Sequence, residues 1–284
     1  MTAFEIRPIA GSLGAELLGL DLRKPLDAET AAAIDRALCE HLVIFFPEQK
    51  LSAAEHVAFS HSLGDVFTDH PAYLPTLEDH PEVVVLSGQA GGRADVWHTD
   101  VTINPRPPKG SILYMKHAPP YGGDTMWANL YRSYDALSEP MKRYLGELTA
   151  VHDIMRGNGV AQSKRSDASN PTGTEYEKRL AGGITLPTAE HPVVRTHPTT
   201  GKKCLFVNPT FTSHIKDVST AESESTLSYL YTHMIQPEFI CRRRWNQGDV
   251  GIWDNRCTMH YAIADYGNEE RVIHRTTLVG DIPV

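Results

Sequence analysis

Short runs of apolar and β-branched residues, each ended by turn residues, recur along the whole chain and constrain its fold more than any other feature. Runs of this length and composition are typical of β-strands. They lie at residues 4–6, 42–46, 83–86, 111–115, 204–207, 239–243, 250–253 and 271–279. Neither a βαβ alternation nor a phosphate-binding glycine loop accompanies them. A mainly antiparallel sandwich or jelly roll with packed helices is therefore expected, rather than a doubly wound parallel sheet.

Helices are expected beside these strands. Asp27 precedes an alanine-rich segment, and Ser52 and Ser219 each stand three residues before a glutamate, which is the pattern of a capping box. These signals predict helices at residues 28–41, 52–63 and 219–235.

The 284 residues can bury a sizeable core as one unit, so a single domain over residues 1–284 is expected. Residues 155–187 are rich in Gly, Ser, Asn and Asp, and we expect them to form a lid loop. No stretch of eighteen apolar residues and no charged start followed by an apolar signal core is found, so a cytoplasmic location is expected.

Charge and cysteine content exclude several classes of function. The formal net charge is -8, and the only basic run is Arg242–Arg244, which argues against nucleic acid or an anionic membrane as a partner. The cysteines form no CxxC pair, so neither a disulfide scaffold nor a structural zinc site is indicated. They are Cys39, Cys204, Cys241 and Cys257.

A possible metal site begins at Trp97-His98-Thr99-Asp100. In an extended segment, His98 and Asp100 point to the same side because side chains alternate. His260 is the candidate for a third ligand. Two histidines and one carboxylate form the facial triad of non-haem iron(II) oxygenases, although a hydrogen-bonded surface pair is the simpler interpretation of a lone HxD.

Arg271 and Arg275 lie four residues apart in the last apolar run and are expected to share one face of a strand. Their Cα atoms would be roughly 13 Å apart, too far to bind one small carboxylate together. Two separate anions are therefore implied, because a guanidinium binds a carboxylate or sulfonate through paired donors. The alternative is a charged strand face paired with Glu269 and Glu270.

Several motifs, taken in order, resemble the taurine dioxygenase family, which includes 2,4-dichlorophenoxyacetate dioxygenase. The resemblance covers nearly the whole chain. The motifs are WHTD at 97–100, GGDT at 122–125, HPVVRTHPTTGKKCLFVN at 191–208, WDNRCTMHYA at 253–262 and RVIHR at 271–275.

The resemblance implies a double-stranded β-helix of the cupin-like, jelly-roll kind and a single catalytic dioxygenase domain that uses Fe(II), 2-oxoglutarate and O2. It also implies a small anionic substrate, above all taurine or a related sulfonate with release of sulfite, and a homodimer or higher homo-oligomer. The implied roles, by matching position, are His98, Asp100 and His260 as iron ligands, Thr125 and Arg271 as 2-oxoglutarate contacts, Arg275 on the substrate's anionic group, and His70, Tyr73 and Phe211 lining the substrate pocket.

The chain departs from the taurine enzyme in places that concern the substrate. Ala94 stands where an asparagine precedes WHTD, and the segment Ile154–Asn158 lacks the expected serine and phenylalanine. A sulfate ester and an aryloxy or alkyl carboxylate therefore remain alternatives, since Arg275 would accept any of these head groups. A metal-dependent hydrolase and a non-catalytic anion-binding protein are rival interpretations.

Overall fold

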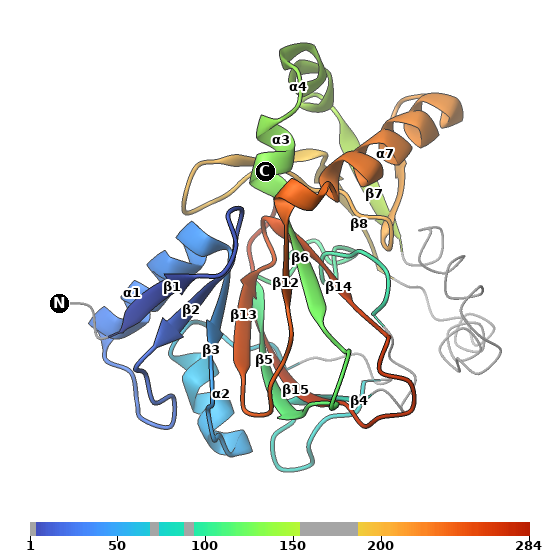
Figure 1. Cartoon of the computed structure of the whole chain (residues 1–284). Coiled ribbons are helices and arrows are strands. Elements are labelled where there is room, and N and C mark those ends of the chain that lie inside the picture. The colour runs from blue at the N-terminus through green and yellow to red at the C-terminus, as the bar shows by residue number, and fades with distance from the viewer. Residues whose placement is uncertain (1–3, 69–73, 88–93, 154–186) are drawn as a thin grey trace.

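Two facing β-sheets form the centre of the computed structural model, which describes residues 4–68, 74–87, 94–153 and 187–284 (Figure 1). The large sheet has the strand order β1-β2-β3-β13-β5-β15-β4, and a smaller sheet, β12-β6-β14, faces it. The strands of the large sheet are β1 Glu5–Pro8, β2 Ala15–Leu18, β3 Val43–Phe46, β4 Val84–Ser87, β5 Gly110–His117, β13 Val250–Asp254 and β15 Val272–Leu278, and those of the smaller sheet are β6 Thr125–Asn129, β12 Ile240–Arg243 and β14 Thr258–Ala262.

A third sheet, β11-β7-β8, and the ribbon β10-β9 gather with three helices at one end of the molecule (Figure 1). The bounds are β7 Thr149–Asp153, β8 Thr188–Pro192, β9 Val194–Thr196, β10 Lys203–Leu205, β11 Thr212–Ile215, α3 Leu130–Asp135, α4 Glu139–Leu145, α7 Thr220–Met234 and the 3-10 turn Pro237–Phe239. Helices α1 Ala28–His41 and α2 Ala53–His61 cover the outer face of the large sheet.

The centre of the large sheet is buried on both faces, which explains the continuous apolar run in β3. Ile44 and Phe46 join the outer core under α1 and α2, whereas Val43 and Phe45 point into the inner core between the two sheets. Strand side chains alternate in direction, so an uninterrupted apolar segment indicates burial on both sides.

The predicted fold class is confirmed: the chain is mainly β, with the jelly-roll arrangement, although its sheets stay open rather than closing into a barrel. Among the described strands, only β2 and β3 pair in parallel. Every predicted apolar run overlaps a strand, and each predicted helix is present. Ser52 and Ser219 both form complete capping boxes.

Strands β2, β6, β7, β8, β9, β11 and β14 and helices α3 and α4 carried no signal strong enough to be predicted. Strand β14, for example, reads Thr-Met-His-Tyr-Ala, where polar and apolar residues mix because the strand contributes a site histidine. The predicted lid at 155–187 lies, apart from Pro187, outside the described residues.

Candidate active site

His98, Asp100 and His260 converge in the structure. Their candidate ligand atoms all lie within 4.8 Å of one another, and all three residues are buried. Asp100 Oδ1 is 3.7 Å from His98 Nε2 and 3.8 Å from His260 Nε2. The backbones of His98 and His260 pair as an isolated antiparallel bridge, with N–O distances of 3.0 and 2.8 Å. This bridge fixes the segment from residue 97 against β14.

The expected extended geometry of Trp97–Asp100 is only partly right. His98 alone forms a β-bridge, whereas Asp100 lies in a turn and is followed by Val101 with φ 51°. A turn, not strand alternation, brings the carboxylate to the imidazoles. Asn255 holds this turn because its Oδ1 accepts from Asp100 N (2.8 Å) and its Nδ2 donates to Asp100 O (3.1 Å).

The Asp100 carboxylate presents one oxygen to the two imidazoles. Ser111 Oγ donates to Oδ2 at 2.9 Å, which leaves Oδ1 facing His98 and His260. Burial alone would raise the pKa of Asp100, but His260, Arg275 and His98 outweigh it and lower this pKa to about 2. Asp100 is therefore an anion at neutral pH.

The two imidazoles are suited to donate lone pairs at Nε2. His98 Nδ1 donates to the carbonyl oxygen of Val96 at 2.7 Å, which fixes the tautomer with Nε2 unprotonated. Burial, with His98 nearby, lowers the pKa of His260 to about 3 and keeps it neutral. Two imidazoles and one carboxylate, on one side of a buried site, fit the donor set of a divalent iron that keeps open positions.

Arg271 is a partly buried cation without a salt-bridge partner among the described residues. It lies directly before β15, not within it, and its Nε donates to Gly123 O at 3.1 Å. Burial lowers its pKa. In the part of the chain that the structure describes, no carboxylate lies within hydrogen-bonding distance of this guanidinium, so the alternative, a pairing with Glu269 or Glu270, is not formed. The orphaned cation fits an external carboxylate.

Arg275 lies next to the metal cluster. Its Nη1 is 3.7 Å from Asp100 Oδ1, and its buried Nε has no hydrogen-bond partner. Ile273 belongs to the inner core, so Arg275, two residues later in β15, lies on the inward face of the strand. Arg271 precedes the strand, and the register shifts between Val272 and Ile273, so the strand face that was expected to hold both arginines does not include Arg271. One guanidinium thus lies at the turn of Gly123 and the other beside Asp100, which supports two separate anion sites.

Thr125, at the start of β6, lies near the Arg271 end of the site because the Gly122–Gly123 turn leads into it. Its Oγ1 accepts from Trp245 Nε1 at 2.9 Å, which leaves the hydroxyl hydrogen free to donate to a bound anion. Gly123 has φ +68°, and a Cβ there would lie 3.1 Å from Arg271 Cδ, so the turn requires glycine to admit the arginine.

Phe211 lies in the turn before β11, partly buried, and its backbone N donates to Asn208 Oδ1 at 2.9 Å. The other pocket residues predicted from the sequence, His70 and Tyr73, fall outside the described residues.

The sequence prediction missed Ser111, Asn255 and Trp245. Asn255 lies inside the motif that contains His260, whereas no local pattern marks Ser111 or Trp245.

A second group of potential ligands consists of Cys39, His197 and Asp254. Here His197 Nδ1 accepts from the amides of residues 199 and 200, so its Nε2 carries the proton that it donates to Asp254 at 3.0 Å. Arg256 binds both oxygens of the same carboxylate, at 2.8 and 2.7 Å. Every polar atom of the imidazole and the carboxylate is thus engaged, so this cluster is a structural brace and does not fit a metal.

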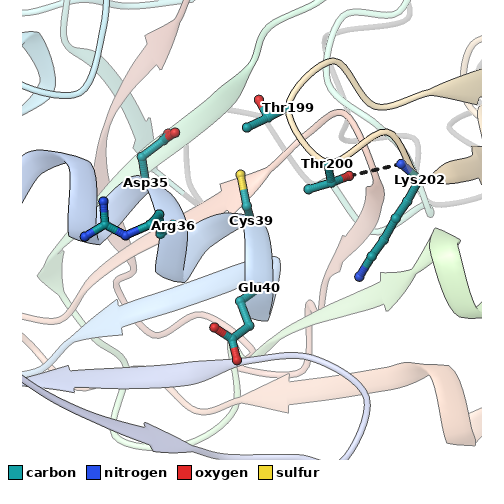
Figure 2. Close-up of a pocket in the computed structure, with 7 residues that line it drawn as sticks. All are labelled: Asp35, Arg36, Cys39, Glu40, Thr199, Thr200 and Lys202. Atoms are coloured by element: carbon teal, nitrogen blue, oxygen red, sulfur yellow. Dashed lines mark hydrogen bonds between the residues drawn. The ribbon is translucent and has the colours of Figure 1, made fainter.

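A hollow of about 290 Å³ beside Cys39 shares no residue with the His98 cluster (Figure 2). Acidic and basic side chains both line it, so it has no charge preference that would select a ligand. The lining residues are Asp35, Arg36, Cys39, Glu40, Thr199, Thr200 and Lys202.

Comparisons with known proteins cover the whole described structure. The family model described as "Taurine catabolism dioxygenase TauD, TfdA family" matches residues 5–277. An α-ketoglutarate-dependent sulfate ester dioxygenase from Pseudomonas putida is 39% identical over 281 residues, which are 99% of this chain and 91% of the relative.

Solved structures resemble the chain equally well. A taurine dioxygenase from Burkholderia xenovorans superposes with a TM-score of 0.84 at 39% identity, covering 99% of this chain and 91% of that one. A protein named AAD-2, in complex with Mn(II) and N-oxalylglycine, gives a TM-score of 0.81 at 28% identity, covering 100% and 99%.

Proposed function

The chain belongs to the taurine catabolism dioxygenase TauD, TfdA family, and we propose that within it this protein oxidises alkyl sulfate esters. Its class follows from membership: it is a non-haem iron dioxygenase that depends on 2-oxoglutarate and O2 and acts on a small anionic substrate. Membership favours this class over the rival interpretations as a hydrolase or a non-catalytic anion-binding protein.

His98, Asp100 and His260 are the residues that would hold the iron. The converging imidazoles, the ionised carboxylate and the hydrogen bonds of Asp100 with Ser111 and Asn255 support this assignment. When bound, iron(II) with 2-oxoglutarate and O2 supplies the chemistry that inserts one oxygen atom into a substrate C–H bond, with succinate and CO2 as coproducts.

Arg271 and Thr125 would bind the distal carboxylate of the cosubstrate 2-oxoglutarate. The guanidinium is partly buried without a salt-bridge partner in the described ranges, and Trp245 occupies one acceptor site of Thr125 so that its hydroxyl can donate. Both residues lie at the turn of Gly123, so they would hold that carboxylate apart from an anion bound at Arg275.

Arg275 is the observation that carries the substrate proposal. Its guanidinium is nearly buried, it has no hydrogen-bonded carboxylate among the described residues, and it lies beside Asp100. A sulfate head group bound there would place the neighbouring carbon next to the metal ligands. The 39% identical relative named as a sulfate ester dioxygenase supports this class, and Ala94, in place of the taurine enzyme's asparagine, argues for a different head-group environment.

Oxidation of an alkyl sulfate ester at this site would release its sulfate group. Hydroxylation of the carbon that bears the ester oxygen gives R–CH(OH)–O–SO3⁻. Cleavage of the bond between that carbon and the ester oxygen then releases an aldehyde and hydrogen sulfate.

A panel of hexyl sulfate, taurine, an alkyl sulfonate and an aryloxyacetate, assayed for succinate and for the released fragment, tests the proposal. We expect hexyl sulfate to give sulfate and succinate in equal amounts. Release of sulfite from taurine or the sulfonate, without turnover of hexyl sulfate, would show that the substrate is a sulfonate and not a sulfate ester. This second candidate is supported by the structural likeness to a taurine dioxygenase. A phenol from the aryloxyacetate alone would contradict both.

The single catalytic domain over residues 1–284, the homo-oligomeric assembly and the cytoplasmic location remain predictions. Within the described ranges, no helix is long and apolar enough to cross a membrane. Size-exclusion chromatography with light scattering measures the assembly directly.

A further inference from the structure

Two turns meet beside the metal ligands. The metal turn, residues 97–102, carries two of the proposed ligands, and the pocket turn, residues 208–212, carries the proposed aromatic wall of the substrate pocket. They come from distant parts of the sequence. Asn208 Nδ2 donates to Thr102 Oγ1 at 3.1 Å, which joins the end of one turn to the start of the other.

A second hydrogen bond joins the same two turns. Thr210 Oγ1 donates to the carbonyl oxygen of Trp97 at 3.1 Å. The Asn208 side chain also reaches within its own turn, because its Oδ1 accepts from Phe211 N at 2.9 Å. One amide group therefore connects Thr102 directly to the backbone of the pocket wall.

Thr102 is the meeting point of several side chains of the third sheet. His152, from β7, is hydrogen-bonded to Thr102 Oγ1 at 2.9 Å, and His191, from β8, donates through Nε2 to Thr102 O at 2.8 Å. Thr102, His152, His191 and Asn208 are all at most 2% exposed. Buried polar groups that lose a partner are costly, so this network holds one arrangement.

The metal turn has separate supports near the ligands. Asn255 binds the Asp100 backbone at both N and O, and Ser111 binds its carboxylate. Thr99 Oγ1 donates to Thr258 O at 3.0 Å. The Asp100 carboxylate would therefore keep its position without the Thr102 hydroxyl, whereas the pocket turn would lose the hydrogen bond from Asn208 and keep only the one from Thr210 to Trp97.

We propose that Thr102 is a positioning residue for the prime substrate, whose hydroxyl sets the position of the pocket turn, and with it Phe211, relative to the Asp100 carboxylate. The inference rests on the proposed function for the identity of the substrate, but the hydrogen bonds that carry it do not. It assigns the third sheet a part in substrate positioning.

The experiment compares Thr102→Val, which removes the hydroxyl at nearly constant volume, with Thr102→Ser, which keeps it. Ser60→Ala is the matched control, because Ser60 is also fully buried and its Oγ also makes hydrogen bonds, to His56 O and to Thr276, but on helix α2. Four quantities are measured: the KM for hexyl sulfate, the ratio of sulfate to succinate, the Kd for Mn(II), and hydrogen exchange in residues 208–212.

We expect Thr102→Val to raise the KM for hexyl sulfate by roughly 10-fold, the equivalent of one lost buried hydrogen bond. The sulfate-to-succinate ratio should fall below one, and exchange at the Phe211 amide should accelerate. The Kd for Mn(II) should change by no more than about twofold, because Asn255 and Ser111 hold Asp100 independently of Thr102. A twofold change is well below the effect of one lost hydrogen bond. Thr102→Ser should give wild-type values for all four quantities, and Ser60→Ala should alter none of them.

A parallel rise in the Kd for Mn(II) and the KM would overturn the proposal, since the whole metal turn would then have loosened. So would wild-type behaviour of Thr102→Val, or equal impairment of Thr102→Ser. If the wild-type enzyme does not turn over hexyl sulfate, the proposed substrate fails. In that case, hydrogen exchange at residues 208–212 and the Kd for Mn(II) still test the role of Thr102, because neither measurement depends on the substrate.

Discussion

At the scale of single residues, the site depends on charges that are buried before any ligand binds. Arg271, directly before the last strand, and Arg275, within it, have no hydrogen-bonded carboxylates among the described residues. Such groups are unfavourable unless a ligand pairs with them, so their presence in a well-packed chain indicates binding sites. Both arginines could be found from the sequence, but their lack of hydrogen-bonded carboxylates among the described residues could not.

Substitution of each arginine should separate the two anions. Arg271→Gln should raise the KM for the cosubstrate 2-oxoglutarate by roughly 100-fold, because a buried, charge-assisted hydrogen-bond pair contributes about 3 kcal/mol. It should leave the KM for the prime substrate nearly unchanged.

Arg275→Gln should raise the KM for the prime substrate and leave the KM for 2-oxoglutarate nearly unchanged. Steady-state kinetics with each substrate varied in turn, with Arg106→Gln as an exposed control, provides the measurement. An exchange of the two effects would mean that the two anion sites are assigned the wrong way round.

At the scale of elements, helix ends were more predictable than the strands of the site. The capping boxes at Ser52 and Ser219 are local, since each needs only a hydroxyl and a glutamate three residues later. Strands β6 and β14 carry Thr125 and His260 and include polar inward-facing residues, so they lack the apolar pattern that identifies a strand.

Removal of the cap at Ser219 tests how far α7 depends on its local signal. Ser219→Ala should lower the free energy of unfolding by about 1 kcal/mol and leave kcat unchanged, because α7 contributes no proposed site residue. Urea unfolding measures the loss, and Ser219→Thr, which keeps a hydroxyl, should recover most of it. An unchanged midpoint for the alanine variant would show that packing alone fixes the start of the helix.

At the scale of the whole molecule, buried neutral histidines should make the metal-free fold sensitive to acid. Burial, with His274 nearby, lowers the pKa of His56 to about 3, and burial, with His191 nearby, lowers that of His152 to about 3. Below about pH 6.5 the unfolded chain takes up protons that the folded chain does not. Stability should therefore fall as the pH decreases from about 6.5 to about 3.

Each such histidine contributes a slope of at most about 1.4 kcal/mol per pH unit in that range. His56→Leu should reduce the slope, as measured by urea unfolding at several pH values with a chelator present. Ser60→Ala, which removes a nearby buried hydroxyl, should lower stability by the same amount at every pH. An unchanged slope in His56→Leu would contradict the assignment of His56 as a buried neutral residue.

The amino-acid sequence by itself determined the strand-rich class, the capped helices and the identity of the proposed ligands and arginines, because these depend on local patterns and ordered motifs. Only the tertiary structure decided how Asp100 reaches the histidines, since a turn held by Asn255, 155 residues away, replaces the expected extended segment. The hydrogen bonds of Thr102 with His152, His191 and Asn208 could not be predicted from the sequence either. Contacts between distant segments arise from packing and hydrogen bonding across sheets, and no local pattern encodes them.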